Sequence, residues 1–531
     1  MIVNNNKKRT VLLAFMWFLE LLVNIWYTAK YVLVNLMNSD WSGDAIFAKH
    51  LADSGHYILS PDWIPTTELY IVHHQLIMVP LLKLFNDYKT VWIITSVIAY
   101  LLISLSIFYF MRCMKRDFDE ILLAVVLFLN PLVVENLTYT VWFHGYLFYY
   151  LMAFILVGVL GKYYVENKKI EFFDLGIVTI VSFLAGVCGI RMFIMVFAPL
   201  VISWVFLNFK TKVIEVWNDY AKLSCVSLAV ALIAFAVYLF VLSPRYGAGF
   251  VVDAMKNNTV TINDSGTMVN NFLHLPQLLL IVLGCDFQNN SIGMLALLKG
   301  ITLCFWIVIF IVLIKGIKKN WDDIRVKYLS TFLLASLIAT AVLIVFLVRP
   351  EDIVDDARYL SLSGFLIFPL YAIVAEEKKR ELLVDFLDVF GYIISAIGIL
   401  AFALNAVVSY GVGEQISWRM PYISYLEENN YDFGLATYWN ANDTMFFSEN
   451  RIEMQPIENE IDLVYMPSNT KKSNADKTPQ FILFSQEEYA NRVSENYADE
   501  ILYMDDRVVI VKADIMYRSV FDRENKELYY E

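Results

Sequence analysis

The sequence is poor in cysteine, in charge and in the short motifs that announce a soluble enzyme. Its five cysteines show no C-x-x-C pair and no metal-ligand spacing, so we expect scattered core residues and no disulfide framework. No H-E-x-x-H motif, internal repeat or low-complexity segment is present. These absences exclude the common zinc-protease and disulfide-scaffold classes, and they leave composition as the first guide.

Charged side chains make up only 18% of the 531 residues, whereas hydrophobic ones make up 58%. The mean hydropathy is +0.55, which is too high for a soluble protein of this length. A membrane-spanning helix needs about 20 apolar residues. The run Val11–Val34 meets this length directly after Lys7, Lys8 and Arg9, and it lacks a small-residue cleavage site. The sequence therefore predicts an α-helical polytopic membrane protein with an uncleaved first span.

Apolar runs of sufficient length predict eleven membrane-spanning helices, at about 11–34, 90–111, 120–137, 145–161, 174–190, 192–208, 223–243, 293–314, 328–348, 359–375 and 384–409. The stretch Ile71–Phe85 is only 15 residues long and contains Pro80 and Lys83. We predict that it is a re-entrant or interfacial helix and that it does not span the membrane.

Basic clusters fix the predicted orientation in the cell membrane. With a cytoplasmic N-terminus, every loop cluster of Lys and Arg falls on the cytoplasmic side: 112–116, 162–169, 210–222, 315–327 and 378–380. Counting Ile71–Phe85 as a span would move all the later clusters outward. An odd number of spans then places the residues after 410 outside the cell.

The C-terminal residues carry the whole net charge. Residues 414–531 hold 23 acidic and 11 basic side chains, a net charge of −12, and residues 1–413 hold 30 of each. We therefore predict a transmembrane module at 1–409 and a soluble acidic domain at 410–531. The runs "QFILF" and "RVVIVKA" are typical of strands and "SQEEYANRVSEN" of a helix, which predicts a small α/β domain. An acidic domain argues against nucleic acid or anionic headgroups as its partner.

The predicted outer face gathers the long loops, 35–89 and 244–292, and all the histidines: His50, His56, His73, His74, His144 and His274. Long polar loops on one face of a helix bundle are typical sites of chemistry.

Asp44 is the first candidate residue on that face. In "SGDAIFAKHLADSG", Ala45, Ala48, Leu51 and Ala52 follow at helical spacing, which predicts a short amphipathic surface helix that begins at Asp44. The alternative is an ordinary helix-start aspartate that is stabilised by the helix dipole.

A first span, then "D…GDA…A…G", an apolar segment with Pro and Leu, and a basic cytoplasmic loop together resemble the GT-C glycosyltransferases. These include the protein O-mannosyltransferases and the lipid A aminoarabinose transferases. The resemblance implies a catalytic Asp in the first outer loop, which matches Asp44, with Ala45 in place of the family's Glu. Asp40 is the second candidate, as a supporting group.

The resemblance also implies the reaction. A hexosyl or pentosyl group would move, with inversion, from a polyprenyl-phosphate donor to an extracytoplasmic glycan, lipid or protein. A donor carried on a membrane lipid agrees with the lack of a nucleotide-binding loop in the acidic domain.

Arginines suit the donor's phosphate. Arg191 lies at the outer mouth between two predicted spans, and Arg358 with Tyr359 begins another, an Arg-Tyr pair that recurs in GT-C proteins. An arginine at membrane depth is a candidate functional residue. The alternative is interfacial snorkelling, in which Asp355 or Asp356 neutralises Arg358.

The remaining candidates are less specific. His73 and His74 are predicted either to contact substrate, to bind a divalent metal or to lie passively at the interface. Glu135 and His144 lie at the next outer mouth beside Tyr139 and Trp142, aromatics that are typical of interface anchors but also of sugar pockets. No cofactor is predicted from the sequence, and a divalent metal stays an alternative.

Three other functions compete with the glycosyltransferase. A transporter or flippase of lipid-linked saccharides would need mid-membrane charges and paired halves with broken helices. Most ionisable residues lie instead at span ends, and no two-fold hydropathy repeat is present. A polysaccharide polymerase or ligase of another fold, or a non-catalytic assembly subunit, would also have long outer loops.

Overall fold

The computed structural model describes residues 2–65, 69–85, 87–208, 218–246, 262–285, 294–347, 358–376, 393, 396–404, 406–408, 411, 416–457, 470–471, 474, 477–494 and 500–513. The chain forms two compact units, and each consists of segments that are far apart in the sequence. The first unit contains Met1–Tyr27, Ser96–Ala236 and Val260–Val412, and the second contains Thr28–Thr95, Val237–Thr259 and Gly413–Glu531.

The predicted domain boundary at residue 410 divides the sequence differently from this grouping. The first outer loop, within Thr28–Thr95, belongs to the same compact unit as the C-terminal residues. The boundary itself stays a prediction, because residues 409 and 410 lie outside the described part of the chain.

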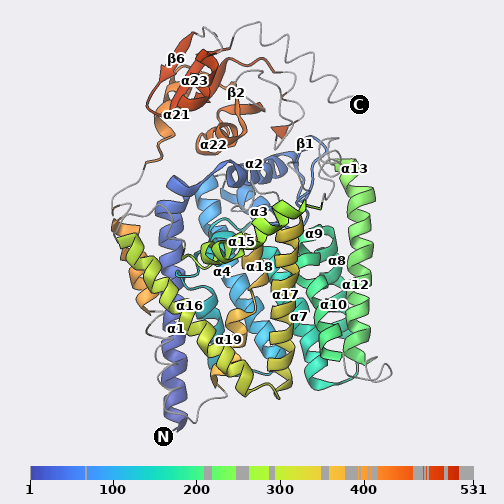
Figure 1. Ribbon diagram of the computed structural model, residues 1–531. Coiled ribbons are helices and arrows are strands. Elements are labelled where there is room, and N and C mark those ends of the chain that lie inside the picture. Colours follow the sequence, from blue (N-terminus) through green and yellow to red (C-terminus); the bar gives the residue numbers. More distant parts are fainter. Residues whose placement is uncertain are drawn as a thin grey trace. The chain divides into compact units, whose positions relative to one another are not determined.

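Eight helices in the described residues are long and apolar enough to cross a membrane. They correspond one by one to eight of the predicted spans: Lys8–Leu36, Tyr88–Cys113, Leu147–Glu166, Ile190–Asn208, Asp219–Tyr246, Ala296–Lys319, Ile324–Leu347 and Arg358–Ala375. The chain is therefore a helical, multi-pass membrane protein (Figure 1).

Two of the other three predicted spans are shorter in the structure. The span predicted at 120–137 is not one helix, because α5 (Phe118–Phe128) ends before Asn130 and Pro131. Proline has no N–H to continue a helix and disfavours helical geometry in the residue before it. Helix α8 (Phe172–Val187) also falls below spanning length. The span predicted at 384–409 stays a prediction, because residues 384–392 lie outside the described part of the chain, which shows an apolar helix at Ala396–Val408.

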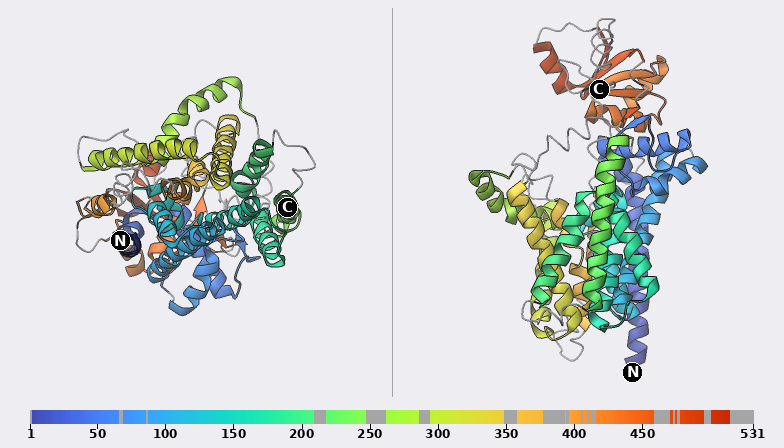
Figure 2. Two further views of the ribbon diagram at one scale, coloured as in Figure 1. Left: turned by 90° about the horizontal axis from the view of Figure 1, so that it is seen from below. Right: turned by 90° about the vertical axis from the view of Figure 1, so that its right-hand side faces the viewer.

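The helices of the first unit pack side by side along their length (Figure 2). Helix α17 packs against α10 and α7, and α5 packs against α1 and α19. Gly186 lets α8 approach α12 closely, because a Cβ atom there would collide with the Ala231 carbonyl oxygen. Helix bounds in or entering this unit are α1 Ile2–Tyr27, α4 Tyr88–Cys113, α6 Val134–Leu137, η2 Thr138–Trp142, α7 Leu147–Glu166, α9 Ile190–Met192, η3 Phe193–Phe197, α10 Ala198–Asn208, α12 Asp219–Val237, α15 Ser265–Val282, α16 Met294–Lys319, α17 Ile324–Leu347, α18 Arg358–Ser363 and α19 Ile367–Glu376.

The second unit combines short surface helices with a sheet. Helix α2 packs against both α3 and α22 (Figure 1). A two-residue strand in the first outer loop, β1, pairs antiparallel with β4, far along the chain. The element bounds are η1 Thr28–Leu36, α2 Ser39–Ser54, β1 Trp63–Ile64, α3 Gln75–Phe85, η4 Tyr238–Leu242, α13 Ser243–Tyr246, α21 Met420–Glu428, β2 Phe433–Thr437, α22 Tyr438–Phe447, β3 Glu453–Ile457, β4 Thr470–Lys471, β5 Phe481–Ser485, α23 Gln486–Ser494, β6 Ile501–Met504 and β7 Val508–Lys512.

The C-terminal sheet has five strands in the order β3-β2-β5-β7-β6. Strands β3, β2 and β5 run parallel, and β7 and β6 are antiparallel to their neighbours. Its core is formed by aliphatic and aromatic side chains of β2, β3, β5 and β7: Leu435, Ile457, Ile482, Phe484, Val509 and Val511. The predicted small α/β domain is confirmed.

Helix α23 begins with a capping box that the sequence "SQEE" encodes. The Glu488 carboxylate accepts a hydrogen bond from the Ser485 amide at 2.6 Å, and the Ser485 hydroxyl accepts one from the Glu488 amide at 3.2 Å. The other Glu488 oxygen accepts a hydrogen bond from the Thr437 hydroxyl at 2.6 Å. A helix cap thus also fastens α23 to the end of β2.

Candidate active site

Helix α2 begins five residues earlier than the sequence pattern predicts. Its cap is Asn38, whose side-chain oxygen accepts a hydrogen bond from the Trp41 amide, and it ends at Gly55 in the left-handed conformation. The prediction that Asp44 starts the helix is therefore wrong. Asp40 occupies the first turn, where the helix dipole favours a carboxylate, and Asp44 lies in the middle of the helix.

The Asp44 side chain is only 6% exposed and lies among the buried residues of α2. The Nε2 atom of His74 lies 3.9 Å from its Oδ2 atom, and His74 is fully buried. One ligand atom each from Asp44, His73 and His74 lies within 4.8 Å of the others. The three residues form a compact cluster at the junction of α2 and the segment that precedes α3.

The neighbouring histidines point to the same side because residues 71–74 are neither helix nor strand. In a strand they would face opposite sides, and in a helix they would diverge by about 100°. Tyr70 stacks on the His73 ring at 4.3 Å between centroids, and Trp92 contacts His74 edge-on at 5.9 Å. Aromatic packing therefore holds both imidazoles in place beside Asp44.

Asp40, in the first turn of α2, contacts Tyr438, the first residue of α22. The Tyr438 hydroxyl donates a hydrogen bond to Asp40 at 2.8 Å, and burial, with the Asp40 charge as a second cause, raises the Tyr438 pKa well above its usual value. The Ser39 hydroxyl donates to the carbonyl oxygens of Tyr438 and Trp439, each at 2.6 Å. The first turn of α2 is thereby fixed to the first turn of α22.

A buried ionic contact makes a second connection between these helices. Asp443 of α22 accepts hydrogen bonds from the Ser42 hydroxyl at 2.8 Å and from the Arg419 guanidinium. Arg419 also donates to the Met37 carbonyl oxygen at 3.0 Å and lies over the rings of Trp418 and Phe447. Burial raises the Asp443 pKa, and the charge of Arg419 opposes this effect.

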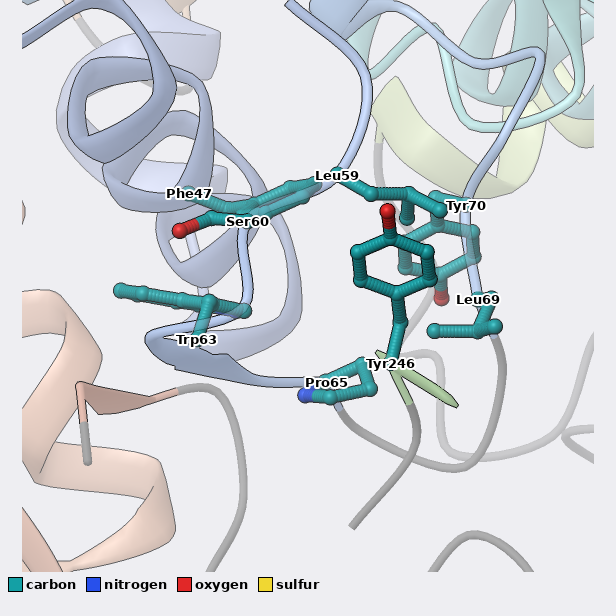
Figure 3. A pocket seen from close by; sticks show the side chains of 8 residues that line it. All are labelled: Phe47, Leu59, Ser60, Trp63, Pro65, Leu69, Tyr70 and Tyr246. Atoms are coloured by element: carbon teal, nitrogen blue, oxygen red, sulfur yellow. The ribbon is translucent and has the colours of Figure 1, made fainter. Parts of the chain in front are cut away.

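An aromatic pocket adjoins the histidine cluster (Figure 3). Its lining comes from the first outer loop and from α13: Phe47, Leu59, Ser60, Trp63, Pro65, Leu69, Tyr70 and Tyr246. Tyr70 belongs both to this lining and to the stack on His73.

His50 supports the same loop. Its Nε2 atom and the Ser60 hydroxyl lie 2.9 Å apart, and its ring lies 5.2 Å from that of Trp63. Burial lowers the His50 pKa, and the charge of Lys471 lowers it further. The neutral form of His50 is therefore the one that the folded loop favours.

Arg191 lies in the first unit, at the start of the helix that α9, η3 and α10 form together. Its guanidinium lies 5.5 Å from the ring centre of Tyr146, which in turn stacks on Tyr139 at 4.9 Å. The neighbouring Tyr149 donates a hydrogen bond to the Cys188 carbonyl oxygen at 3.5 Å. Tyrosine side chains thus lie beside this arginine.

Arg358 is the first residue of α18, and its guanidinium lies 5.7 Å from the ring centre of Tyr359. One turn further on, the Ser361 hydroxyl contacts the Tyr150 hydroxyl at 2.9 Å and the Asn136 side-chain oxygen at 3.3 Å. These hydrogen bonds connect the Arg358 helix to the segment 136–150, which also contacts Arg191.

His144 lies in that same segment with a left-handed backbone, φ 61°. Such a conformation costs a non-glycine residue about 1–3 kcal/mol and persists where surrounding contacts impose it. Its Nε2 atom lies 2.9 Å from the Ser96 hydroxyl, and its side chain is fully buried. The Glu135 side chain lies outside the described part of the structure.

The structure thus assembles the predicted residues in two groups. Asp40, Asp44, His73 and His74 belong to the second compact unit, and Arg191, His144, Arg358 and Tyr359 belong to the first. That the two groups act on one substrate stays a prediction. The sequence analysis missed Ser42, Arg419, Tyr438 and Asp443. The polar and aromatic stretch "TYWNAND" signals only Tyr438 and Asp443.

Comparison with known proteins gives one informative result. No family model matches the sequence, and no curated protein matches it. Among solved structures, the chain is similar to the crystal structure of ArnT from Cupriavidus metallidurans bound to undecaprenyl phosphate, with a TM-score of 0.53 and 13% sequence identity. The similarity covers 97% of this chain and 99% of that one. The chain therefore has the fold of ArnT.

Proposed function

We propose that the protein is a membrane glycosyltransferase that moves a sugar from a polyprenyl-phosphate donor to an extracytoplasmic acceptor. The observation that carries the proposal is the similarity over nearly the whole chain to ArnT, a protein whose structure holds undecaprenyl phosphate. The buried carboxylate in the first outer loop supports it, because the resemblance in sequence assigns catalysis to that position.

In the proposed reaction Asp44 is the general base. It takes the proton of the acceptor hydroxyl while that oxygen attacks the anomeric carbon of the sugar. The bond from that carbon to the phosphate oxygen breaks, and its electron pair leaves with the polyprenyl phosphate. Attack from the face opposite the phosphate inverts the anomeric centre. A positioned base typically contributes about 10²–10⁴-fold to the rate.

The leaving phosphate gains negative charge in this step, and cations stabilise such charge. We assign this role to Arg191 and Arg358, whose planar guanidinium groups can each form two hydrogen bonds to a phosphate. Tyr146 and Tyr359 lie against them and restrict their movement. In this proposal the N-terminus is cytoplasmic and the C-terminal domain extracytoplasmic.

The test is transfer by the purified, full-length protein in detergent. Polyprenyl-phosphate donors with labelled hexoses and pentoses are offered together with an envelope extract as acceptor. Release of polyprenyl phosphate that depends on the acceptor is the expected result. A protein that instead moves intact donor across liposome membranes, with no cleavage, is a flippase and contradicts the proposal.

A further inference from the structure

We propose that Asp44, His73 and His74 form a binding site for one divalent transition-metal ion. The three side chains come from α2 and from the segment before α3, and their ligand atoms lie within 4.8 Å of one another. The sequence leaves metal binding as one of three alternatives for His73 and His74, because adjacent histidines are not a usual ligand spacing. The irregular backbone at residues 71–74 brings both rings to the side of Asp44.

The donor set indicates the class of metal. Two imidazole nitrogens and one carboxylate oxygen suit zinc and the neighbouring first-row metals. Magnesium and calcium prefer sites made of oxygen ligands only. Three protein ligands leave a fourth position of a tetrahedral ion for water or a substrate oxygen.

The geometry requires a modest contraction. Metal–ligand bonds of about 2.0–2.1 Å in a tetrahedral site place the ligand atoms roughly 3.3 Å apart. Asp44 Oδ2 and His74 Nε2 lie 3.9 Å apart, and the whole set spans at most 4.8 Å. Metal binding therefore requires the three ligand atoms to move closer together.

The surroundings favour a bound cation. All three side chains are buried, with Asp44 and His73 only 6% and 5% exposed. A positive charge stabilises a buried carboxylate, and a metal ion can supply that charge. Tyr70 and Trp92 hold the two imidazoles in place, as the outer partners of metal ligands commonly do.

Metal binding goes beyond the proposed function and does not depend on it. If both hold, the open position beside Asp44 receives the acceptor hydroxyl, and the ion makes that hydroxyl easier to deprotonate.

The experiment uses the full-length protein in detergent, with any affinity tag removed and bound metals stripped by a chelator. After dialysis against Zn²⁺ or Co²⁺, the metal content is measured by mass spectrometry, and Co²⁺ coordination is followed by visible absorption. We expect one ion per chain, and an at least tenfold weaker affinity in Asp44→Asn, His73→Gln and His74→Ala. His56→Ala and His274→Ala, which remove exposed histidines, should bind as the wild type does.

The proposed metal site is refuted if the wild-type protein retains no ion. It is also refuted if the three site variants bind the metal as tightly as the control variants do. Gel filtration and thermal unfolding identify a variant that misfolds, and the remaining two variants then decide. Transfer is measured on the same samples. If the protein binds the ion but transfers no sugar, the metal site stands and the proposed glycosyltransferase function is contradicted. If the protein binds no ion but transfers sugar without metal, and Asp44→Asn reduces that transfer, the glycosyltransferase function stands and the metal site is contradicted.

Discussion

Ser42 on α2 donates a 2.8 Å hydrogen bond to Asp443 on α22, although 401 positions separate the two residues in the sequence. Arg419 binds the other oxygen of the same carboxylate. Through this carboxylate the C-terminal domain holds the helix that carries the candidate base, two residues from Ser42. The first outer loop and the C-terminal domain therefore form one structural module.

The contact of Asp443 with Ser42 and Arg419 should contribute to the stability of this module. Asp443→Ala leaves the buried Arg419 charge uncompensated and should destabilise the protein by about 3–5 kcal/mol. Ser42→Ala removes one buried hydrogen bond and should cost about 1–3 kcal/mol. Thermal unfolding of the detergent-purified protein measures both changes.

The matched control is the ion pair of Arg451 and Glu427, whose side chains are 54% and 33% exposed. Glu427→Ala should cost no more than about 1 kcal/mol, because exposed ion pairs contribute little. If Asp443→Ala is as mild as this control, the buried contact does not hold α2.

Asp44→Asn should reduce transfer by about 10²–10⁴-fold, because the amide cannot accept the proton of the acceptor hydroxyl. Folding should be retained, since the amide keeps the size of the carboxylate. The measurement is the rate of polyprenyl phosphate release. Asp53→Asn is the control, because Asp53 lies on the same helix, is exposed and pairs with Lys49. Equal activity of the two variants would refute a catalytic role for Asp44. If only Asp40→Asn abolishes transfer, the general base is Asp40, one helical turn earlier.

Arg191→Lys and Arg358→Lys should raise the KM for the donor more than the KM for the acceptor. Lysine keeps the positive charge but loses the planar pair of donors that suits phosphate. Arg451→Lys, at an exposed pair, should leave both constants unchanged. Unchanged donor kinetics in both variants would instead favour interfacial snorkelling as their role.

The charge bias of the loops predicts the orientation. Val493→Cys lies on α23 with its side chain 49% exposed, and it should react with a membrane-impermeant thiol reagent in intact cells. Lys318→Cys, in a basic cluster predicted to be cytoplasmic, should react only after lysis. Both are measured as labelling above that of the five native cysteines. The reverse pattern would place the C-terminal domain inside.

The lowered pKa of His50 predicts that the free energy of unfolding depends on pH. Its pKa is lowered in the folded protein, chiefly by burial, so the unfolded chain binds a proton more readily as the pH falls below about 6.5. Stability should therefore be complete above that pH and decrease as the pH falls toward the folded pKa. His50→Gln should lose less stability between pH 7.5 and 5.5 than the wild type in thermal unfolding. Parallel losses would show that other groups cause the acid sensitivity.

The sequence by itself determines the membrane helices and the small α/β domain. A bilayer requires a local run of apolar residues of fixed length, so runs such as 90–111 and 328–348 predict helices α4 and α17 directly. The strands β5 and β7 likewise follow from short continuous apolar runs, and the helix α23 from a local pattern of 3.6 residues. Local signals also name Asp44 and both arginines as candidates.

Only the tertiary structure decides where the helices begin and end and which residues meet. Asn38 starts α2 earlier than the apolar pattern suggests, and Pro131 shortens a predicted span. The cluster of Asp44 with His73 and His74, and the contact of Ser42 with Asp443, join residues about 30 to 400 positions apart. No periodicity encodes such contacts, because they depend on how α2, α3 and α22 pack together.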